Sequence, residues 1–250
     1  MKVEAFFDRE YFDSGEENPR RRKGYIEYSF SSIYPDLEML ASRLEKILKP
    51  RRILDVGCAK GFLVLAFRNM GMESYGVDIS DYALGQAPDK IRRYLMKADL
   101  NTDRTPFDTG TFDLITATSV LHHLNFPNAL REMRRVIADH GILFVQIPYT
   151  KASDRKYVGP CFVEVQETSQ RDEEYWIKEV QSYGFEFMCK MTNDNYSSLI
   201  NERLERDLKS GRSLKYMVGR RIHSVPKLGR WVLEKHYRSK IVFFLFFRAR

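Results

Sequence analysis

Apolar and polar positions alternate along the chain in blocks that predict strands and helices by turns. Apolar side chains recur on one helical face between residues 34 and 48, and Pro50 follows this segment, as expected after a helix end. From residue 51 onward, short apolar runs predict strands, and longer runs with a helical period predict helices. The predicted strands span 53–56, 74–78, 94–98, 112–117, 141–147, 185–191 and 241–247. The predicted helices between them span 62–70, 81–87, 127–138 and 172–183.

Strands that alternate with helices predict an α/β fold, in which a mostly parallel sheet carries helices on both faces. The expected architecture is a Rossmann-like doubly wound sheet with right-handed crossovers. The chain divides into four parts on this basis. Residues 1–50 form an N-terminal leader and cap helix, 51–194 the Rossmann-like core, 195–239 a basic helical insertion or cap, and 240–250 the final core strand.

The positive charge of the chain is concentrated in the insertion. The formal net charge is +7, and residues 195–238 contain eleven Lys or Arg against four Asp or Glu, a surplus of seven. Such a segment favours an anionic partner, whether a nucleic acid, a phosphorylated metabolite or a membrane surface. The rest of the chain is close to neutral, so any electrostatic attraction belongs to this one segment.

The remaining composition predicts a globular cytoplasmic protein. Hydrophobic residues make up 43% of the chain, enough for a buried core. Cys58, Cys161 and Cys189 have neither pairing nor zinc-ligand spacing, so reduced thiols are expected. The apolar run 241–247 is far shorter than the ~20 residues that cross a bilayer in a helix, so any membrane contact would be peripheral.

The stretch from residue 53 to 63 combines a strand, a tight glycine turn and the start of a helix. Gly57 and Gly61 lack a Cβ, so the backbone of the turn can adopt unusual φ/ψ angles and approach a ligand closely. Free N–H groups and the helix dipole add an electrostatic attraction for an anionic group. Ligands of open α/β sheets bind at the carboxyl ends of the strands, so the turn predicts a ligand site.

A nicotinamide dinucleotide is one candidate ligand, and its fingerprint is Gly-x-Gly-x-x-Gly. The three positions here are Gly57, Ala59 and Phe62, and phenylalanine is too large for close packing of helix on strand. Asp55, just before the turn, would repel a pyrophosphate. The same carboxylate fits beside the cationic methionine moiety of S-adenosylmethionine (SAM), which is therefore the favoured ligand.

Two further acids lie at the ends of the next two predicted strands. Asp78 comes 21 positions after Gly57, where a carboxylate can accept hydrogen bonds from both ribose hydroxyls. Asp99 could accept a hydrogen bond from the adenine amino group, with Leu100 beside the ring. Each acid alone would more often be a solvated loop residue. Together with Asp55 they place three acids beside one glycine turn, which indicates a cofactor site.

Several segments, in order along the chain, resemble the serial motifs of class I SAM-dependent methyltransferases. The segments are Asp55-Val56-Gly57-Cys58-Ala59-Lys60-Gly61, Gly76-Val77-Asp78-Ile79-Ser80, Ala98-Asp99-Leu100, Pro106-Phe107, Phe112-Asp113-Leu114 and Val120-Leu121-His122-His123-Leu124. The resemblance covers about residues 35–192 and is closest to small-molecule enzymes with the methyltransferase domain, including ones associated with glycan biosynthesis. Two departures are that Ala59 and Lys60 replace commoner residues in the loop, and that His122 stands where many relatives carry Glu.

This resemblance implies SAM as the cofactor, with S-adenosylhomocysteine (SAH) as its product. It also implies a sheet of seven strands whose last strand runs antiparallel. The cofactor-binding residues expected from the matching motifs are Asp55, Gly57, Cys58, Ala59, Gly61, Asp78, Ile79, Asp99, Leu100 and Thr118.

Catalytic residues are harder to predict, because methyl transfer mainly requires the acceptor to lie about 3 Å from the methyl group, in line with sulfur. A general base helps when the acceptor is a hydroxyl. The candidates are His122 and His123 after the fourth strand, and Glu164 in the loop after the fifth. The histidines could instead pack or cap the next helix, and the glutamate could be a solvated loop residue. No metal site is predicted, because no carboxylates cluster near the end of the fourth strand.

Aromatic residues near the N-terminus are candidates for a lid over the site. They are Tyr11, Phe12, Tyr25 and Tyr28. The alternative is that these rings only pack the leader against the domain.

Three functions remain open. The first, which we favour, is O-methylation of a small molecule or sugar, where the insertion could attract a phosphorylated, nucleotide-linked or lipid-linked acceptor. The second is methylation of RNA or DNA, with the insertion contacting phosphates. Against it, Thr118-Ser119-Val120-Leu121 stands where amino-methylating enzymes of that class carry Asn-Pro-Pro-aromatic. The third is a non-catalytic SAM-binding protein, against which the intact glycines and acids of the cofactor motifs argue.

Overall fold

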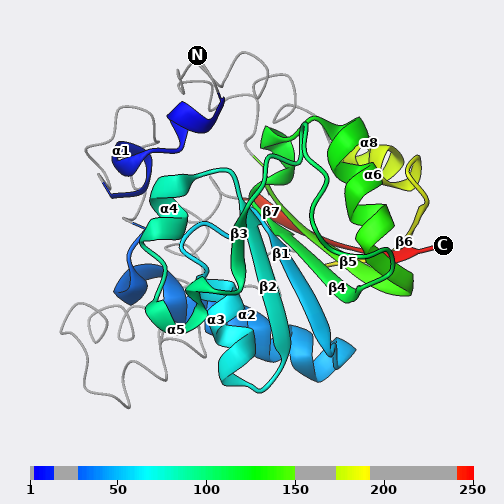
Figure 1. The fold of residues 1–250 in the computed structure, drawn as a ribbon. Helices are drawn as coiled ribbons and strands as arrows, with labels where there is room; N and C mark the ends of the chain where they lie inside the picture. Colours follow the sequence, from blue (N-terminus) through cyan, green and yellow to red (C-terminus); the bar gives the residue numbers. More distant parts are fainter. Residues whose placement is uncertain (1–2, 14–27, 150–172, 192–240) are drawn as a thin grey trace, which may run out of the picture.

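The computed structural model describes residues 3–13, 28–149, 173–191 and 241–250. Its strands are β1 (Arg52–Val56), β2 (Glu73–Asp78), β3 (Leu95–Lys97), β4 (Phe112–Thr118), β5 (Ile137–Tyr149), β6 (Phe185–Met191) and β7 (Ile241–Ala249). They form one sheet of seven strands in the order β3-β2-β1-β4-β5-β7-β6 (Figure 1). β7 runs antiparallel to β5 and to β6, whereas the other neighbouring strands are parallel. The predicted fold class is therefore confirmed, including the direction of the last strand.

Helices cover both faces of this sheet (Figure 1). One face carries α2 (Phe30–Leu48) and α3 (Phe62–Asn69), and the other carries α6 (Phe126–Val136) and α8 (Glu173–Gln181). The short helices α4 (Asp81–Gly85) and α5 (Asp89–Arg92) follow β2. The N-terminal residues form η1 (Val3–Phe6) and α1 (Arg9–Asp13).

The two-residue period of the strands divides the core into two apolar clusters. Successive side chains of a strand point to opposite faces, so neighbouring apolar residues belong to different clusters. The cluster with α2 and α3 includes Ile53, Leu114, Phe144 and Phe246. The cluster with α6 and α8 includes Leu54, Ile115, Val145 and Phe247. Continuous apolar runs are therefore required in the central strands, which explains why the sequence pattern identified them.

Two element boundaries differ from the predicted ones by four residues, the other predicted boundaries differ by no more than two, and the short helix α5 was not predicted. α2 begins at Phe30 rather than at residue 34, which places Pro35 in the second turn of the helix rather than in the first. Phe30 stacks on Tyr34 at 4.4 Å between ring centroids and contacts Phe62 edge-on at 5.5 Å. This packing stabilises the additional helical residues on the N-terminal side of the proline. β5 begins at Ile137 rather than at residue 141, because Ile137 pairs with β4 before a shift in register.

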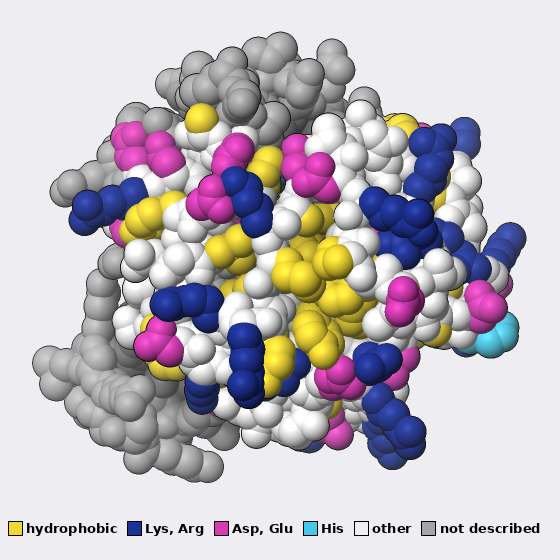
Figure 2. Space-filling model, in the orientation of Figure 1, with side chains coloured by type: hydrophobic (Ala, Val, Ile, Leu, Met, Phe, Trp, Pro, Cys, Tyr) yellow, Lys and Arg dark blue, Asp and Glu magenta, His cyan; other side chains and the backbone are white. Residues whose placement is uncertain are grey.

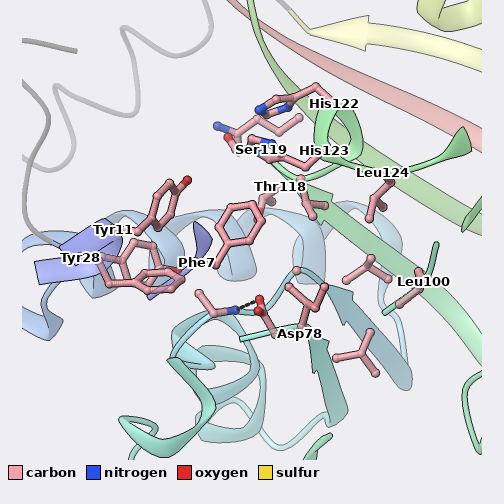
Figure 3. Close-up of a pocket in the computed structure, with 18 of the residues that line it drawn as sticks. Phe7, Tyr11, Tyr28, Asp78, Leu100, Thr118, Ser119, His122, His123 and Leu124 are labelled. Carbon is pink, nitrogen blue, oxygen red and sulfur yellow. Dashed lines mark hydrogen bonds between the residues drawn. The ribbon is translucent and has the colours of Figure 1, made fainter. Parts of the chain in front are cut away.

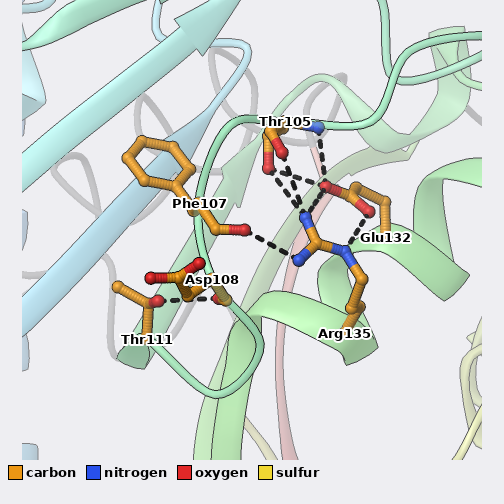
Figure 4. A network of polar contacts seen from close by, with 6 residues as sticks. All are labelled: Thr105, Phe107, Asp108, Thr111, Glu132 and Arg135. Carbon is orange, nitrogen blue, oxygen red and sulfur yellow. Dashed lines mark hydrogen bonds and ion pairs between the residues drawn. The ribbon is translucent and has the colours of Figure 1, made fainter.

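The connection from β3 to β4, residues 98–111, contains no helix and is held by a buried polar network (Figure 4). Glu132 Oε1 accepts hydrogen bonds from the backbone N–H and the hydroxyl of Thr105, at 2.8 and 2.6 Å. Arg135, on the same helix α6, pairs with Glu132 and donates to the carbonyl oxygen of Phe107 at 2.7 Å. The network provides hydrogen-bond partners for backbone groups of a loop that forms neither helix nor strand.

Hydrophobic side chains reach the surface on the face of the molecule shown in Figure 2, where charged side chains of both signs surround them. Tyr75, Met96 and Phe107 are partly buried hydrophobic residues that pack against the core. Phe107 also packs edge-on against Phe112, with ring centroids 4.7 Å apart. The aromatic ring of Phe107 in this connection thus packs on the core in the place where a helix would otherwise pack.

Parts of the predicted organisation fall outside the described residues, namely residues 14–27 of the leader and the basic insertion 195–239. The cap helix predicted before the core corresponds to α2. No helix within the described ranges is long and apolar enough to cross a membrane.

Candidate functional site

A cavity of about 370 Å³ opens at the carboxyl ends of β1, β2, β3 and β4 (Figure 3). This edge of the sheet is where the glycine turn was expected to form a ligand site. Nine of the predicted site residues line the cavity together: Gly57, Ala59, Asp78, Ile79, Asp99, Leu100, Thr118, His122 and His123. The cavity therefore joins residues from four separate strand ends.

The turn after β1 has backbone torsions and packing that favour glycine. Gly57 has a φ of 72°, and a Cβ at this position would lie 2.4 Å from Cγ2 of Val120. Gly61 also has a φ of 72°, and its Cβ would lie 2.6 Å from Cδ1 of Ile91. Any side chain at either position would displace a neighbouring side chain and strain the backbone.

Asp78 ends β2, and backbone N–H groups fix its carboxylate. Oδ2 accepts from Ala59 at 2.7 Å and Oδ1 accepts from Ser80 at 2.8 Å. The residue is only 9% exposed, and burial raises the pKa of its carboxyl although these hydrogen bonds oppose the change. Each carboxylate oxygen retains a second lone pair, so the group can still accept hydrogen bonds from a ligand in the cavity.

Asp99 and Leu100 follow β3 and line the same cavity. The half-buried Asp99 accepts a hydrogen bond from the N–H of Asn101 at 3.0 Å. Leu100 is buried, and Leu124 lies near it on the same side of the cavity (Figure 3). An acid beside apolar side chains can accept a hydrogen bond from an amino group while the apolar groups contact the attached ring.

Asp55, Cys58 and Gly61 are predicted site residues that do not line the cavity. The buried Asp55 accepts a hydrogen bond from the hydroxyl of Thr116, its neighbour on β4, at 2.7 Å. Burial raises the pKa of the Asp55 carboxyl to about 7; the bond from Thr116 opposes this shift and the charge of Asp78 adds to it. Cys58 packs where a side chain of Gly76 would lie. These residues support the turn from beneath.

His122 and His123 lie in the short 3-10 helix η3 (Leu121–His123), which follows β4 after Ser119 and Val120. Their ring centroids are 4.0 Å apart, and His123 contacts Phe7 edge-on at 5.3 Å. Burial lowers the pKa of His123 to about 4, and burial together with the neighbouring histidine lowers the pKa of His122 well below its ordinary value. Both rings are therefore neutral near pH 7, and a neutral imidazole has one nitrogen that accepts hydrogen bonds. Glu164 lies outside the described residues.

Part of the cavity wall was not anticipated from the sequence. Ile33, Leu37 and Leu40 of α2 line the cavity, although the sequence pattern indicated only a helix with a core-facing stripe. The sequence feature that could have indicated this role is the position of the apolar helix directly before the first strand. Of the aromatic residues considered as a lid, Tyr11, Phe12 and Tyr28 line the cavity, and Tyr25 lies outside the described residues.

The charge of the cavity favours a cation. Its described lining contains Asp36, Asp78 and Asp99 but no Lys or Arg. The two histidines add no positive charge near pH 7, because burial lowers the pKa of each. Within the described ranges, no three His, Cys, Asp or Glu side chains lie together as a metal site requires.

Comparison with known proteins gives a consistent picture. Residues 54–145 match the family described as methyltransferase domain. Malonyl-[acyl-carrier protein] O-methyltransferase of Legionella pneumophila is 36% identical over 110 residues, which cover 42% of this chain and 39% of that protein. An uncharacterized protein of Methanocaldococcus jannaschii is 28% identical over 149 residues, which cover 58% of this chain and 60% of that protein.

The fold also matches solved structures. The complex of Haemonchus contortus phosphoethanolamine N-methyltransferase 2 with SAM has a TM-score of 0.60 at 14% identity, covering 100% of this chain and 60% of that chain. The matches span 39% and 60% of the two curated relatives, so the likeness concerns the domain rather than the whole of those proteins. Residues 54–145 thus belong to a methyltransferase domain, and the sheet order and the motifs at the strand ends are those of the class I SAM-dependent type.

Proposed function

We propose that this protein binds SAM in the cavity and transfers its methyl group to a hydroxyl oxygen of a small molecule or sugar. The observation that carries the proposal is the carboxylate of Asp78, which is buried, fixed by two backbone N–H groups and placed in a cavity whose described lining is acidic. SAM suits such a cavity because its sulfonium and ammonium groups are both cationic.

The residues around the cavity fit the parts of SAM. Asp78 would accept hydrogen bonds from the ribose hydroxyls, and Asp99 from the adenine amino group, with Leu100 against the adenine ring. Gly57 would allow the methionine moiety to approach the backbone of the turn. Asp55, beneath the turn, would add negative charge on the side of the sheet that carries α2 once it is ionised, and a nearby sulfonium would favour that ionised form. When bound, SAM supplies an electrophilic methyl group that needs no further activation.

A dinucleotide fits the same cavity less well. A pyrophosphate carries negative charge, and the described lining offers it three carboxylates without a Lys or Arg. Lys60, the cation closest in sequence to the turn, is already paired with Asp13 at 2.7 Å. This charge distribution supports the choice of cofactor made from the motif alone.

The acceptor end of the site would lie beside His122 and His123. Each neutral imidazole can accept a hydrogen bond from the acceptor hydroxyl and so orient its oxygen toward the methyl group. A base with a pKa of about 4 takes a proton only partially at neutral pH, so His123 would act more by orientation than by full proton removal. The naming of the Legionella relative as an O-methyltransferase supports oxygen as the acceptor atom.

An anionic part of the acceptor would need cations from elsewhere in the chain. The described lining provides none, whereas residues 195–238 carry a surplus of seven positive charges. We therefore assign recognition of a phosphorylated, nucleotide-linked or lipid-linked portion of the acceptor to the basic insertion.

The test is transfer of a deuterated methyl group from SAM to a panel of sugars, nucleotide-linked sugars, lipid-linked sugars and RNA, read as a mass shift of the acceptor. We expect transfer to a hydroxyl of a small acceptor. His122→Gln and His123→Gln should each lower kcat by about 100-fold, because the acceptor oxygen would lose the hydrogen bond that orients it, while the Kd for SAH stays within about twofold.

Asp139→Asn is the matched control, because Asp139 is 81% exposed and pairs with Arg134 away from the cavity. Methylation of RNA alone would contradict the proposed acceptor. Tight binding of SAH without transfer to any acceptor would instead favour the non-catalytic SAM-binding alternative.

A further inference from the structure

The N-terminal residues 3–13, which we name the strap, lie against the cavity. The rings of Phe7, Tyr11 and Phe12 belong to the cavity wall. These rings also pack on one another, with centroid separations of 4.9 Å between Phe7 and Tyr11 and 5.0 Å between Tyr11 and Phe12 (Figure 3). A strap of this kind would cover a bound cofactor and exclude water from it.

Two polar contacts tie the first half of the strap to the loops after β2 and β3. The hydroxyl of Ser80 donates to the carbonyl oxygen of Phe7 at 2.5 Å. The N–H of the same serine donates to Asp78, so one residue contacts both the strap and the proposed ribose-binding carboxylate. Lys97, two residues before Asp99, pairs with Glu4 at 2.5 Å.

A third contact ties the end of the strap to the glycine turn itself. Lys60 lies within the turn, is only 8% exposed, and places Nζ 2.7 Å from Oδ1 of Asp13. The other oxygen of Asp13 accepts a short hydrogen bond from the hydroxyl of Tyr82 on α4. Asp13 therefore joins the strap to the two loops that contact Asp78.

The protonation states of this cluster keep it intact near neutral pH. Burial acts to raise the pKa of the Asp13 carboxyl, but the hydrogen bonds from Lys60 and Tyr82 outweigh it and the pKa is lowered. Burial and the bond to Asp13 raise the pKa of Tyr82 to about 12. The carboxylate is thus ionised and the phenol protonated, which is the combination that the contacts require.

We propose that Lys60, Asp13 and Tyr82 form a latch that holds the strap closed over bound SAM or SAH and slows release of the cofactor. The inference rests on the proposed function, because it needs the cofactor to occupy the cavity. The three side chains are positioning residues, since they act through the turn and the strap rather than on the reacting atoms. Lys60 also replaces a commoner residue in the loop, and the latch gives this replacement a function.

The test compares SAH dissociation rates by surface plasmon resonance for the full chain and for Asp13→Asn, Lys60→Met and Tyr82→Phe. Loss of a hydrogen-bonded charge pair should accelerate SAH dissociation by about tenfold for Asp13→Asn and for Lys60→Met, and less for Tyr82→Phe. The double variant of Asp13 and Lys60 should be no faster than the faster single variant, because both changes remove one contact. Asp139→Asn, which breaks an ion pair between Arg134 of α6 and the exposed Asp139 of β5, should leave the rate unchanged.

A merely structural role would lower the thermal midpoint in the absence of SAH, whereas the latch predicts midpoints within about 2 °C of wild type for the mild Asp13→Asn change. Wild-type dissociation rates in all three variants would overturn the latch and leave the proposed function standing. Failure of the wild-type chain to bind SAH would instead refute the proposed function on which the latch depends.

Discussion

At the scale of single residues, the three acids at the strand ends lie in different environments. Asp78 and Asp99 line the cavity, whereas Asp55 lies beneath it and bonds to Thr116. The sequence placed all three at one edge of the sheet, because the carboxyl ends of neighbouring parallel strands coincide there. It could not assign Asp55 to the supporting position, because that depends on its pairing with β4, a strand about sixty residues away.

The buried position of Asp55 predicts a pH dependence of stability. Burial raises its pKa from the ordinary 3.8 to about 7, so the folded chain keeps this proton over a range in which the unfolded chain has lost it. The folded state then binds more protons, and this residue makes the free energy of unfolding fall as pH rises through that window. Asp55→Asn keeps an oxygen for Thr116 but cannot titrate. Urea unfolding at pH 5 and pH 8 should therefore show a smaller decrease for the variant than for wild type, and an equal decrease would argue against a raised pKa.

At the scale of elements, the strands and helices of the core were largely predictable because their apolar patterns match the two faces of one sheet. The glycine turn and Asp78 were predictable for the same reason, since they lie at the ends of apolar runs that mark strands. The first turn of α2 was not, because stacking of Phe30 on Tyr34 and Phe62 overrides the usual effect of Pro35. The sequence also could not show that Leu37 and Leu40 line the cavity, because an apolar residue gives the same sequence pattern whether its side chain faces the core or a cavity.

The network between α6 and the β3–β4 connection predicts a large effect of one substitution. Arg135→Met would leave the buried carboxylate of Glu132 without its cation and the carbonyl oxygen of Phe107 without its donor. The free energy of unfolding should fall by about 3 kcal/mol or more, as for a broken buried pair. Arg134→Met is the matched control on the same helix, because its partner Asp139 is exposed; it should cost less than about 1 kcal/mol. Equal losses in urea unfolding would show that the network does not hold the connection.

At the scale of the whole molecule, the site depends on three parts: a sheet that aligns strand ends, an acidic cavity at those ends, and a strap that lies against the cavity. The sequence supplied the first two, since both follow from periodicity and from the chemistry of residues at predicted strand ends. For the strap, the sequence offered Tyr11 and Phe12 as candidates for a lid. It could not show how the strap is held, because the contacts with Lys60, Ser80 and Lys97 join residues far apart in the chain. The role assigned to the basic insertion stays a prediction from its charge.

The most direct test of the central claim is calorimetric titration of SAH into the full chain and into Asp78→Asn. The carboxylate of Asp78 would accept hydrogen bonds from the ribose, and the loss of charge-assisted bonds should raise the Kd by about tenfold to 100-fold. Asp139→Asn should bind SAH as the wild type does. Absence of SAH binding by the wild-type chain, or an unchanged Kd for a folded Asp78→Asn variant, would contradict the placement of the cofactor in this cavity.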